Sequence, residues 1–192
     1  WQIPVADCGV TIRDYDSFSG EVMAIGEKAP LALISGACSA RMAVCEAITN
    51  IAANDIGSLS NIKLSANWMA ASGLGREDEV LFDAVKAIGE ELCPQLDIGI
   101  PVGKDSMSMK QKYPNDEVIA PGTVIISAAA HCDDITKVVE PVFKQNAGDI
   151  YYINLSQDDF KLGGSSFAQI MNKIGSNTPN VKSANYVKTV FN

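Results

Sequence analysis

Two carboxylates and one amide stand out as side chains that could bind a cation together. Glu46 and Asn50 lie four residues apart in 40–54, ARMAVCEAITNIAAN, a run of good helix formers that is apolar on nearly all sides. This spacing places both side chains on one face of a buried helix. Asp7 lies within 1–13, whose alternation of apolar and polar residues predicts a strand. A sheet strand and the helix packed on it can bring the three together.

The chemistry that suits these three residues is the binding of a hard divalent cation. Carboxylate and amide oxygens are ligands for Mg²⁺, which usually keeps several waters and takes phosphate oxygens from a substrate. A buried carboxylate is also stable when it is paired or hydrogen-bonded. The residues Asp7, Glu46 and Asn50 therefore predict either a magnesium site or a buried hydrogen-bonded network, and their spacing leaves both interpretations open.

Two other segments and one histidine could bind a ligand or take part in catalysis, and a purely structural role is the alternative for each. In GKDSMSMK, which follows an expected strand, Lys104 and Ser106 could hold a phosphate or a carboxylate, or form part of a polar strand. GGSS at 163–166 is either a phosphate turn at a helix N-terminus or a simple helix start. His131 has no Ser/His/Asp or Cys/His set around it with supporting context, so we predict no catalytic residue in the chain.

Composition narrows the class of protein. The 192 residues suit one domain, or one domain and part of a second, and 47% hydrophobic residues are ample for a packed core. A net charge of −8 without a Lys/Arg cluster argues against nucleic acid as a partner. The sequence contains no apolar run of about eighteen residues, so it predicts no membrane span. The five cysteines, an odd number without a CxxC pair, predict reduced thiols in a cytoplasmic protein.

The elements that must position these residues alternate loosely between strands and helices. Gly20 and Gly26 suggest a turn and a loop over 14–29, and Ser39 is the expected N-cap of the buried helix. Further strands are expected over 61–69, 98–103, 122–132 and 149–155, with helices from Pro30 to Ile34, from Glu77 until Pro94 stops it, and after the 163–166 turn. The tail from Ser176 is polar and predicts no element.

This pattern predicts an α/β or α+β fold with helices on one face of a mixed sheet. Charge, proline and glycine over 133–148 place a domain boundary near 145. We therefore expect a first domain over 1–145 and part of a second domain over 146–192. Trp1 is not an initiator Met, and an apolar cluster precedes the last residue, so we expect both ends to be cuts through a longer protein.

Six segments together resemble the large, single-chain type of phosphoribosylformylglycinamidine synthase, a glutamine-dependent amidotransferase of purine synthesis. They are WQIPVADCGVT, GEVMAIGEKAP, SARMAVCEAITNIAA, IKLSANWMAA, AVKAIGEELCP and IPVGKDSMSMK. The resemblance covers residues 1 to about 170, and SANWMAA and PVGKDSMSM are its most specific parts. In this family the synthetase region is an internal duplication of the aminoimidazole ribonucleotide synthetase fold, and this chain is similar to the second half.

The resemblance implies a site. The second half of the synthetase region holds an auxiliary, structural nucleotide, whereas the other half carries the catalytic ATP site. The resemblance places Asp7, Glu46 and Asn50 on the Mg²⁺ ligands of the auxiliary site and Ala6 on a backbone contact to the nucleotide. A further Asp ligand is expected beyond Asn192.

The resemblance also implies an activity for the intact protein. The reaction is the ATP- and glutamine-dependent conversion of formylglycinamide ribonucleotide to formylglycinamidine ribonucleotide, with Mg²⁺ and ATP or ADP as cofactors. The partners would be the other synthetase half and a glutaminase domain, whose catalytic Cys-His-Glu set is absent from this sequence. By itself we expect the chain to be inactive and to form a homodimer. The alternatives are a non-catalytic nucleotide-binding scaffold, or another ATP-dependent enzyme of the same fold, an aminoimidazole ribonucleotide or selenophosphate synthetase.

Overall fold

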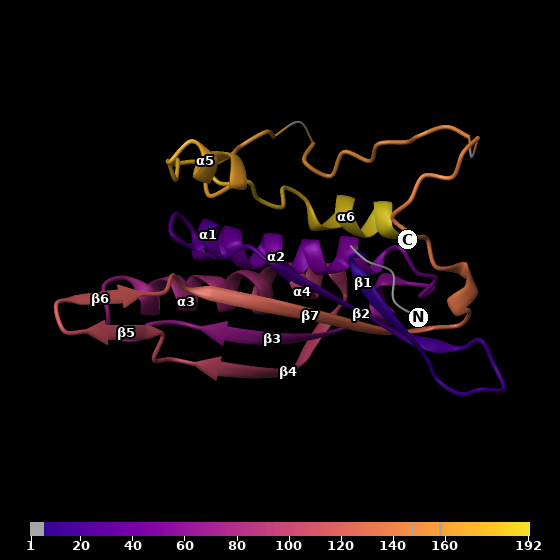
Figure 1. Cartoon of the computed structure of the whole chain (residues 1–192), viewed down its shortest axis with the longest axis horizontal. Helices are drawn as coiled ribbons and strands as arrows, with labels where there is room; N and C mark the ends of the chain where they lie inside the picture. Colours follow the sequence, from indigo (N-terminus) through magenta and orange to yellow (C-terminus); the bar gives the residue numbers. More distant parts are fainter. Residues whose placement is uncertain (1–5, 147, 158) are drawn as a thin grey trace.

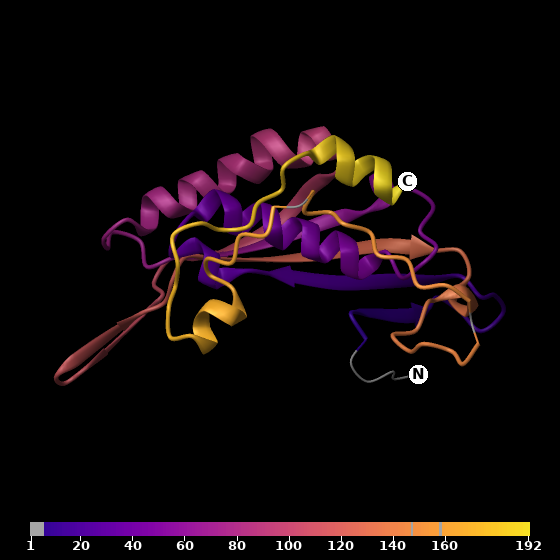
Figure 2. The same cartoon turned by 90° about the horizontal axis from the view of Figure 1, so that it is seen from above.

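A computed structural model describes residues 6–146, 148–157 and 159–192 of the chain (Figure 1). In this part, five strands form one sheet in the order β1-β2-β7-β3-β4, in which β3 and β4 are parallel and the other neighbours are antiparallel. The strands are β1 (Cys8–Ile12), β2 (Gly20–Glu27), β3 (Lys63–Met69), β4 (Gly99–Ser106) and β7 (Thr123–Cys132). A separate hairpin, β5 (Lys110–Tyr113) and β6 (Asp116–Ile119), projects from the body of the molecule (Figure 2).

Helices cover one face of this sheet (Figures 1 and 2). They are α1 (Ala29–Ala32), α2 (Gly36–Ile51), α3 (Glu77–Lys86), the π-helix η2 (Ala87–Leu92), α4 (Cys93–Leu96), α5 (Ser166–Ile170) and α6 (Ala184–Phe191), with 3₁₀ turns η1 (Leu59–Asn61) and η3 (Ile135–Lys137). The expected α+β architecture, with helices on one face of a mixed sheet, is confirmed. None of the helices in the described residues is long and apolar enough to cross a membrane.

Helix α2 is the centre of the core, as its composition predicts. It packs on β2 and β7 and buries an unbroken set of small and branched side chains, including Ala43, Ala47 and Ile48. The helix begins four residues before the predicted start, because Ser35 caps it by accepting a hydrogen bond from the Cys38 amide at 3.3 Å. The predicted cap at Ser39 is wrong. The Ser39 side chain is buried and donates to the Lys28 carbonyl at 2.7 Å.

The loop expected over 14–29 is wrong, because β2 lies within it. Along β2, Gly20, Val22, Ala24 and Gly26 are buried under the helices, while the residues between them are mostly exposed. The glycines that suggest a turn instead allow close packing. A Cβ on Gly26 would lie 2.1 Å from the Ala43 carbonyl oxygen of α2, so only glycine fits there.

The helix predicted to stop at Pro94 continues to Leu96. The path passes from α3 through η2, and Pro94 lies in the first turn of α4. A proline in a first turn lacks only an N–H that the helix does not need, and the π-helix provides the break in register ahead of it. Asp97 then ends the helix in the left-handed conformation, with φ of 61°.

Two predictions for the C-terminal part are also wrong. Residues 149–155 form no strand, and Ile150, Tyr151 and Tyr152 are largely exposed. The tail contains α6, capped by Ser183, which buries Val187 against the core beside α4. The helix after 163–166 is confirmed as α5. The domain boundary near 145 stays a prediction.

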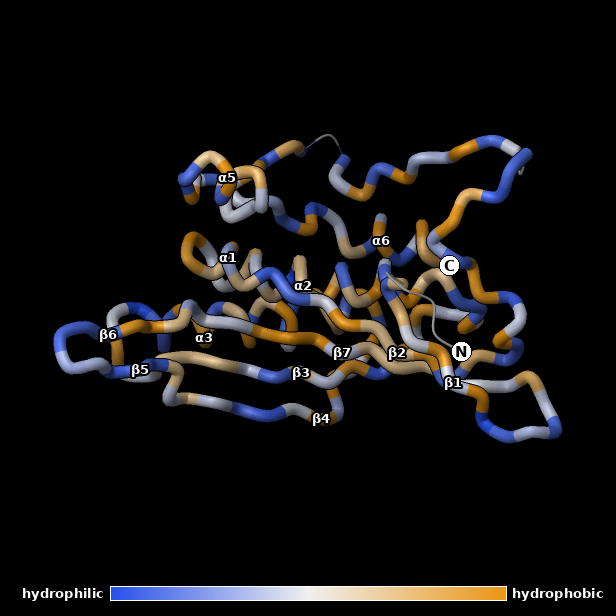
Figure 3. Tube along the Cα trace, in the orientation of Figure 1, coloured by the Kyte–Doolittle hydropathy of each residue, from blue (hydrophilic) through white to orange (hydrophobic). Residues whose placement is uncertain are grey.

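In the part of the chain that the structure describes, no helix lies over the other face of the sheet. It carries alternate residues of each strand, among them Met23 at 55%, Ile25 at 58% and Val102 at 61% exposure. Figure 3 shows apolar residues along β7 and α2, where the core forms, and a hydrophilic tip on the β5–β6 hairpin. The sheet therefore has one buried face and one open, partly apolar face.

Candidate cation site

Glu46 lies on the side of α2 that faces the junction between β2 and α1. One of its carboxylate oxygens, Oε2, accepts a hydrogen bond from the backbone N–H of Glu27 at 2.6 Å. The other, Oε1, accepts from the ammonium of Lys28 and forms an ion pair with it. The Glu46 side chain is 29% exposed, so solvent and ligands reach the carboxylate.

Asn50 lies one turn further along the same helix face, as its spacing from Glu46 predicts. Its Nδ2 donates to the backbone carbonyl of Ile25 at 2.9 Å. That bond fixes the orientation of the side-chain amide, and no hydrogen bond to Oδ1 is found within the described ranges. Since Oδ1 is an oxygen donor held in a set position, Asn50 can supply one ligand to a hard cation.

Ala6 and Asp7 are exposed and lie immediately before β1. The first residue of that strand, Cys8, pairs with Ala24 of β2, and its sulfur accepts a hydrogen bond from Asn54 Nδ2 at 3.2 Å. The start of β1 therefore lies against the turn that follows α2. Among the described residues, no hydrogen bond or ion pair joins Asp7 to Glu46 or Asn50.

Glu46, Asn50 and Asp7 thus border one strip along β2, with Glu46 next to Glu27, Asn50 next to Ile25 and the start of β1 next to Ala24. The described residues contain no group of three or more His, Cys, Asp or Glu that could hold a metal ion. Two carboxylates and one amide oxygen nevertheless fit Mg²⁺, because this ion completes its shell with waters and phosphate oxygens. The donor types therefore fit the cation. The positive charge that lies beside Glu46 in the structure is the ammonium of Lys28.

Glu27 and Lys28 also lie beside Glu46, and the sequence motifs do not single them out. The carboxylate of Glu27 accepts a hydrogen bond from the amide of Ala29, the first residue of α1. Lys28 is the N-cap residue of that helix. The signal was present in GEKAP, where a cation stands between a strand and the proline that starts a helix. Because a loop is expected over 14–29, the sequence does not predict a strand end and a helix start at this pattern.

Lys104 and Ser106 lie elsewhere. They are on β4, at the far edge of the sheet, with Lys104 opposite Asn67 and Ser106 opposite Met69 of β3. The Lys104 ammonium donates to the Asp105 carbonyl at 2.9 Å and to the Ser106 hydroxyl. Two strands, β7 and β3, separate them from β2, so they do not belong to the strip that holds Glu46.

The GGSS turn packs against the body of the protein. The Gly163 amide donates to the Asn177 carbonyl at 2.8 Å, and the Gly164 amide donates to the Ile174 carbonyl at 2.7 Å. Gly164, with φ of +71°, lies directly on Leu31 of α1. Both amides are used internally, which supports the simple helix start over a phosphate turn.

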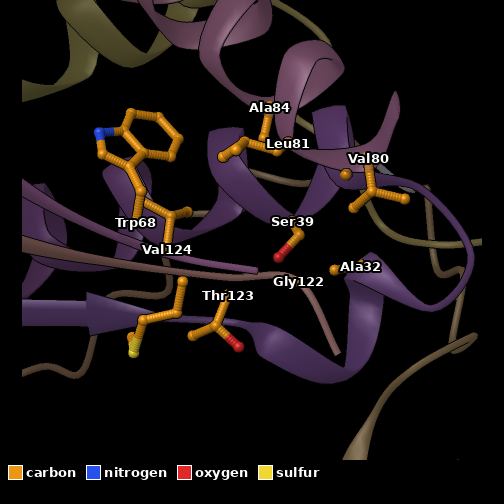
Figure 4. Close-up of a pocket in the computed structure, with 11 residues that line it drawn as sticks. Ala32, Ser39, Trp68, Val80, Leu81, Ala84, Gly122, Thr123 and Val124 are labelled. Carbon is orange, nitrogen blue, oxygen red and sulfur yellow. The ribbon is translucent and has the colours of Figure 1, made fainter. Parts of the chain in front are cut away.

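A cavity lies between α1, α3 and the ends of β3 and β7 (Figure 4). Its walls are mostly apolar and include Trp68, Val80, Leu81 and Val124 (Figure 4). Its volume is about 10 Å³, which is space for at most one water. The cavity is a small packing gap, and the cation site lies at the surface beside β2.

A five-stranded mixed sheet covered on one face by α2 and α3 defines an α+β domain of PurM-like fold. Residues 1–131 match the model of the FGAR-AT PurM_N-like domain family, and the chain belongs to this family. This match confirms the resemblance to phosphoribosylformylglycinamidine synthase in the sequence.

Solved structures from Thermotoga maritima share the fold. The chain is similar to T. maritima PurL complexed with ADP, with a TM-score of 0.53 and 19% identity over 72% of this chain and 22% of that one. The structure of PurLQS from the same organism gives the same values. PurL complexed with ATP has a TM-score of 0.50 and 19% identity, covering 70% of this chain and 21% of that one. The chain thus spans about a fifth of the length of these proteins.

Proposed function

We propose that this chain is part of the synthetase region of a formylglycinamidine ribonucleotide synthase and holds a nucleotide with Mg²⁺ there. The observation that carries the proposal is the pair of oxygen donors on α2. Glu46 and Asn50 are both oriented by hydrogen bonds to β2, at 2.6 Å and 2.9 Å, and Glu46 is within reach of solvent. The family match and the fold shared with PurL support the same assignment.

In this proposal Glu46, Asn50 and Asp7 hold the cation, and the backbone of Ala6 contacts the nucleotide. Mg²⁺ when bound neutralises charge on the polyphosphate. The hydrogen bonds from Glu27 and to Ile25 keep the two α2 side chains in place before a ligand arrives, so little side-chain freedom remains to be lost on binding.

We propose further that this site supports the synthetase without transferring phosphate. The reaction of the intact protein would use ATP to phosphorylate the formyl amide oxygen of the ribonucleotide, and ammonia released from glutamine would then displace phosphate. In this proposal that step takes place in the other synthetase half, and this half acts as a nucleotide-bound framework. Lys104 and Ser106 would make any contact to phosphate or substrate on the open face of the sheet, away from the cation. The five free thiols support a cytoplasmic location.

Calorimetric titration of the purified chain with ADP and Mg²⁺ tests the proposal. We expect Glu46→Ala to weaken binding about tenfold or more, because it removes a charged ligand of the cation, and Asn50→Ala to weaken it less. Glu117→Ala removes a carboxylate on the β5–β6 hairpin and should leave binding unchanged. Equal affinity in the wild type and Glu46→Ala would contradict the site. Release of phosphate from ATP by the wild type would contradict the framework role.

A further inference from the structure

Among the contacts described along the strip, the contact from Lys28 is the one that can be exchanged without moving the backbone. Glu46 Oε2 is bound to a backbone amide, and Asn50 Nδ2 is bound to a backbone carbonyl. By contrast, Glu46 Oε1 is held by the ammonium at the end of the Lys28 side chain, which is 37% exposed. The ammonium of a lysine lies at the end of a flexible four-carbon chain, so it can change position at a small cost in free energy.

The main chain of Lys28 is fixed by hydrogen bonds, and its side chain reaches Glu46 through the terminal ammonium. The Lys28 carbonyl accepts hydrogen bonds from the Ser39 hydroxyl at 2.7 Å and from the Leu31 amide at 3.1 Å. Glu27, the adjacent carboxylate, is occupied with the Ala29 amide and does not compete with Glu46 for the ammonium. The Lys28 ammonium can therefore change its contact while the main chain of Lys28 stays in place beside the Glu46 carboxylate.

We propose that Lys28 is a resident counterion that selects a metal–nucleotide complex over a bare metal ion. This inference rests on the proposed function. The ammonium neutralises Glu46 when the site holds no ligand. When a nucleotide with its Mg²⁺ binds, the ammonium would move to a phosphate oxygen and would leave Glu46 Oε1 available to the cation.

The selection follows from charge. A bare divalent cation that approaches Glu46 meets the positive charge of Lys28 and must displace it into water. A nucleotide complex brings phosphate oxygens that accept the displaced ammonium in a charge-assisted hydrogen bond. The same lysine therefore opposes binding of the metal alone and favours binding of the metal with its nucleotide.

Manganese binding followed by electron paramagnetic resonance separates these effects, with and without ADP. For Lys28→Met we expect Mn²⁺ alone to bind about fivefold more tightly and Mn²⁺ with ADP about tenfold more weakly, since the repulsion and the phosphate contact are both lost. Lys28→Arg keeps the charge and should retain most of the preference for the complex. Lys112→Met, which removes a lysine on the β5–β6 hairpin, is the control and should behave as the wild type.

The variants separate the role of Lys28 from the existence of the cation site. If Glu46→Ala loses Mn²⁺ and ADP but Lys28→Met changes both affinities equally, or neither, Lys28 is not the selecting counterion and the cation site stands. If Glu46→Ala binds Mn²⁺ and ADP as the wild type does, the cation site itself is wrong. Circular dichroism of each variant shows whether a loss of binding reflects loss of fold.

Discussion

Gly26 of β2 lies so close to Ala43 of α2 that a Cβ on the glycine would stand 2.1 Å from the Ala43 carbonyl oxygen. One residue further along the strand, the Glu27 amide donates to Glu46, one helical turn beyond Ala43. The close approach of strand and helix and the orientation of the candidate ligand therefore depend on the same glycine.

Gly26→Ala should destabilise the protein by about 2–4 kcal/mol, since the helix and the strand must separate to admit a methyl group. Urea unfolding measures the loss. Gly9→Ala on β1 is the matched control, because a Cβ there meets no atom within 4 Å, and it should change stability by about 0.5 kcal/mol at most. Similar losses for the two variants would show that the contact between Gly26 and Ala43 does not limit packing.

Much of the fold follows from local sequence signals, and the failures have physical causes. The buried helix around Glu46 is predicted correctly because its apolar residues surround it on all sides. The strand β2 is missed because glycines usually mark turns, whereas Gly26 is required here by a helix that is distant in sequence. The 149–155 segment has the composition of a strand and has no neighbouring strand to pair with in the described structure.

In the candidate site, too, local spacing predicts some features, and contacts between distant residues decide the others. The spacing of Glu46 and Asn50 predicts their shared face, and both side chains do point to β2. Lys28 could not be assigned as the partner of Glu46 because 18 residues separate the two, and only the packing of α2 on β2 brings them together. Tertiary contacts of this kind leave no periodic signal in the sequence.

The thiols of Cys45 and Cys93 should resist alkylation in the native protein. Burial, and then the neighbouring Cys93, raise the pKa of Cys45 to about 12, and burial raises the pKa of Cys93 to about 11. The reactive species is the thiolate, so iodoacetamide at pH 8 should label both residues slowly in buffer and rapidly in denaturant. Peptide mass spectrometry reads each site separately. Fast labelling of Cys45 in the folded chain would contradict its packing against the core.

Asp78 should make stability depend on pH in the acid range. Hydrogen bonds from the Ser72 hydroxyl at 2.7 Å and the Gly73 amide at 3.0 Å lower the pKa of Asp78 below its usual 3.8. Because the folded-state pKa is the lower one, the stabilisation is present above the unfolded pKa and is lost as pH falls through the folded value. The difference in unfolding free energy between wild type and Asp78→Asn should therefore shrink as the pH falls from 6 to about 3. Ser72→Ala removes the hydroxyl donor and should reduce the same pH dependence, and a difference that stays constant with pH would refute this role of Asp78.

The open face of the sheet should drive self-association of the isolated chain. Met23, Ile25 and Val102 lie on that face and are 55%, 58% and 61% exposed, and in the described structure no helix covers them. Burying such a face against a second copy would remove apolar surface from water, and symmetric pairing through one shared face is the commonest arrangement. Sedimentation equilibrium should show a dimer, and Met23→Glu should shift it to monomer while leaving the fold intact, because this side chain makes no part of the buried core. Ile170→Glu, at an 82% exposed position on α5, is the control and should stay dimeric. A wild-type chain that remains monomeric at high concentration would show that the open face does not pair with itself.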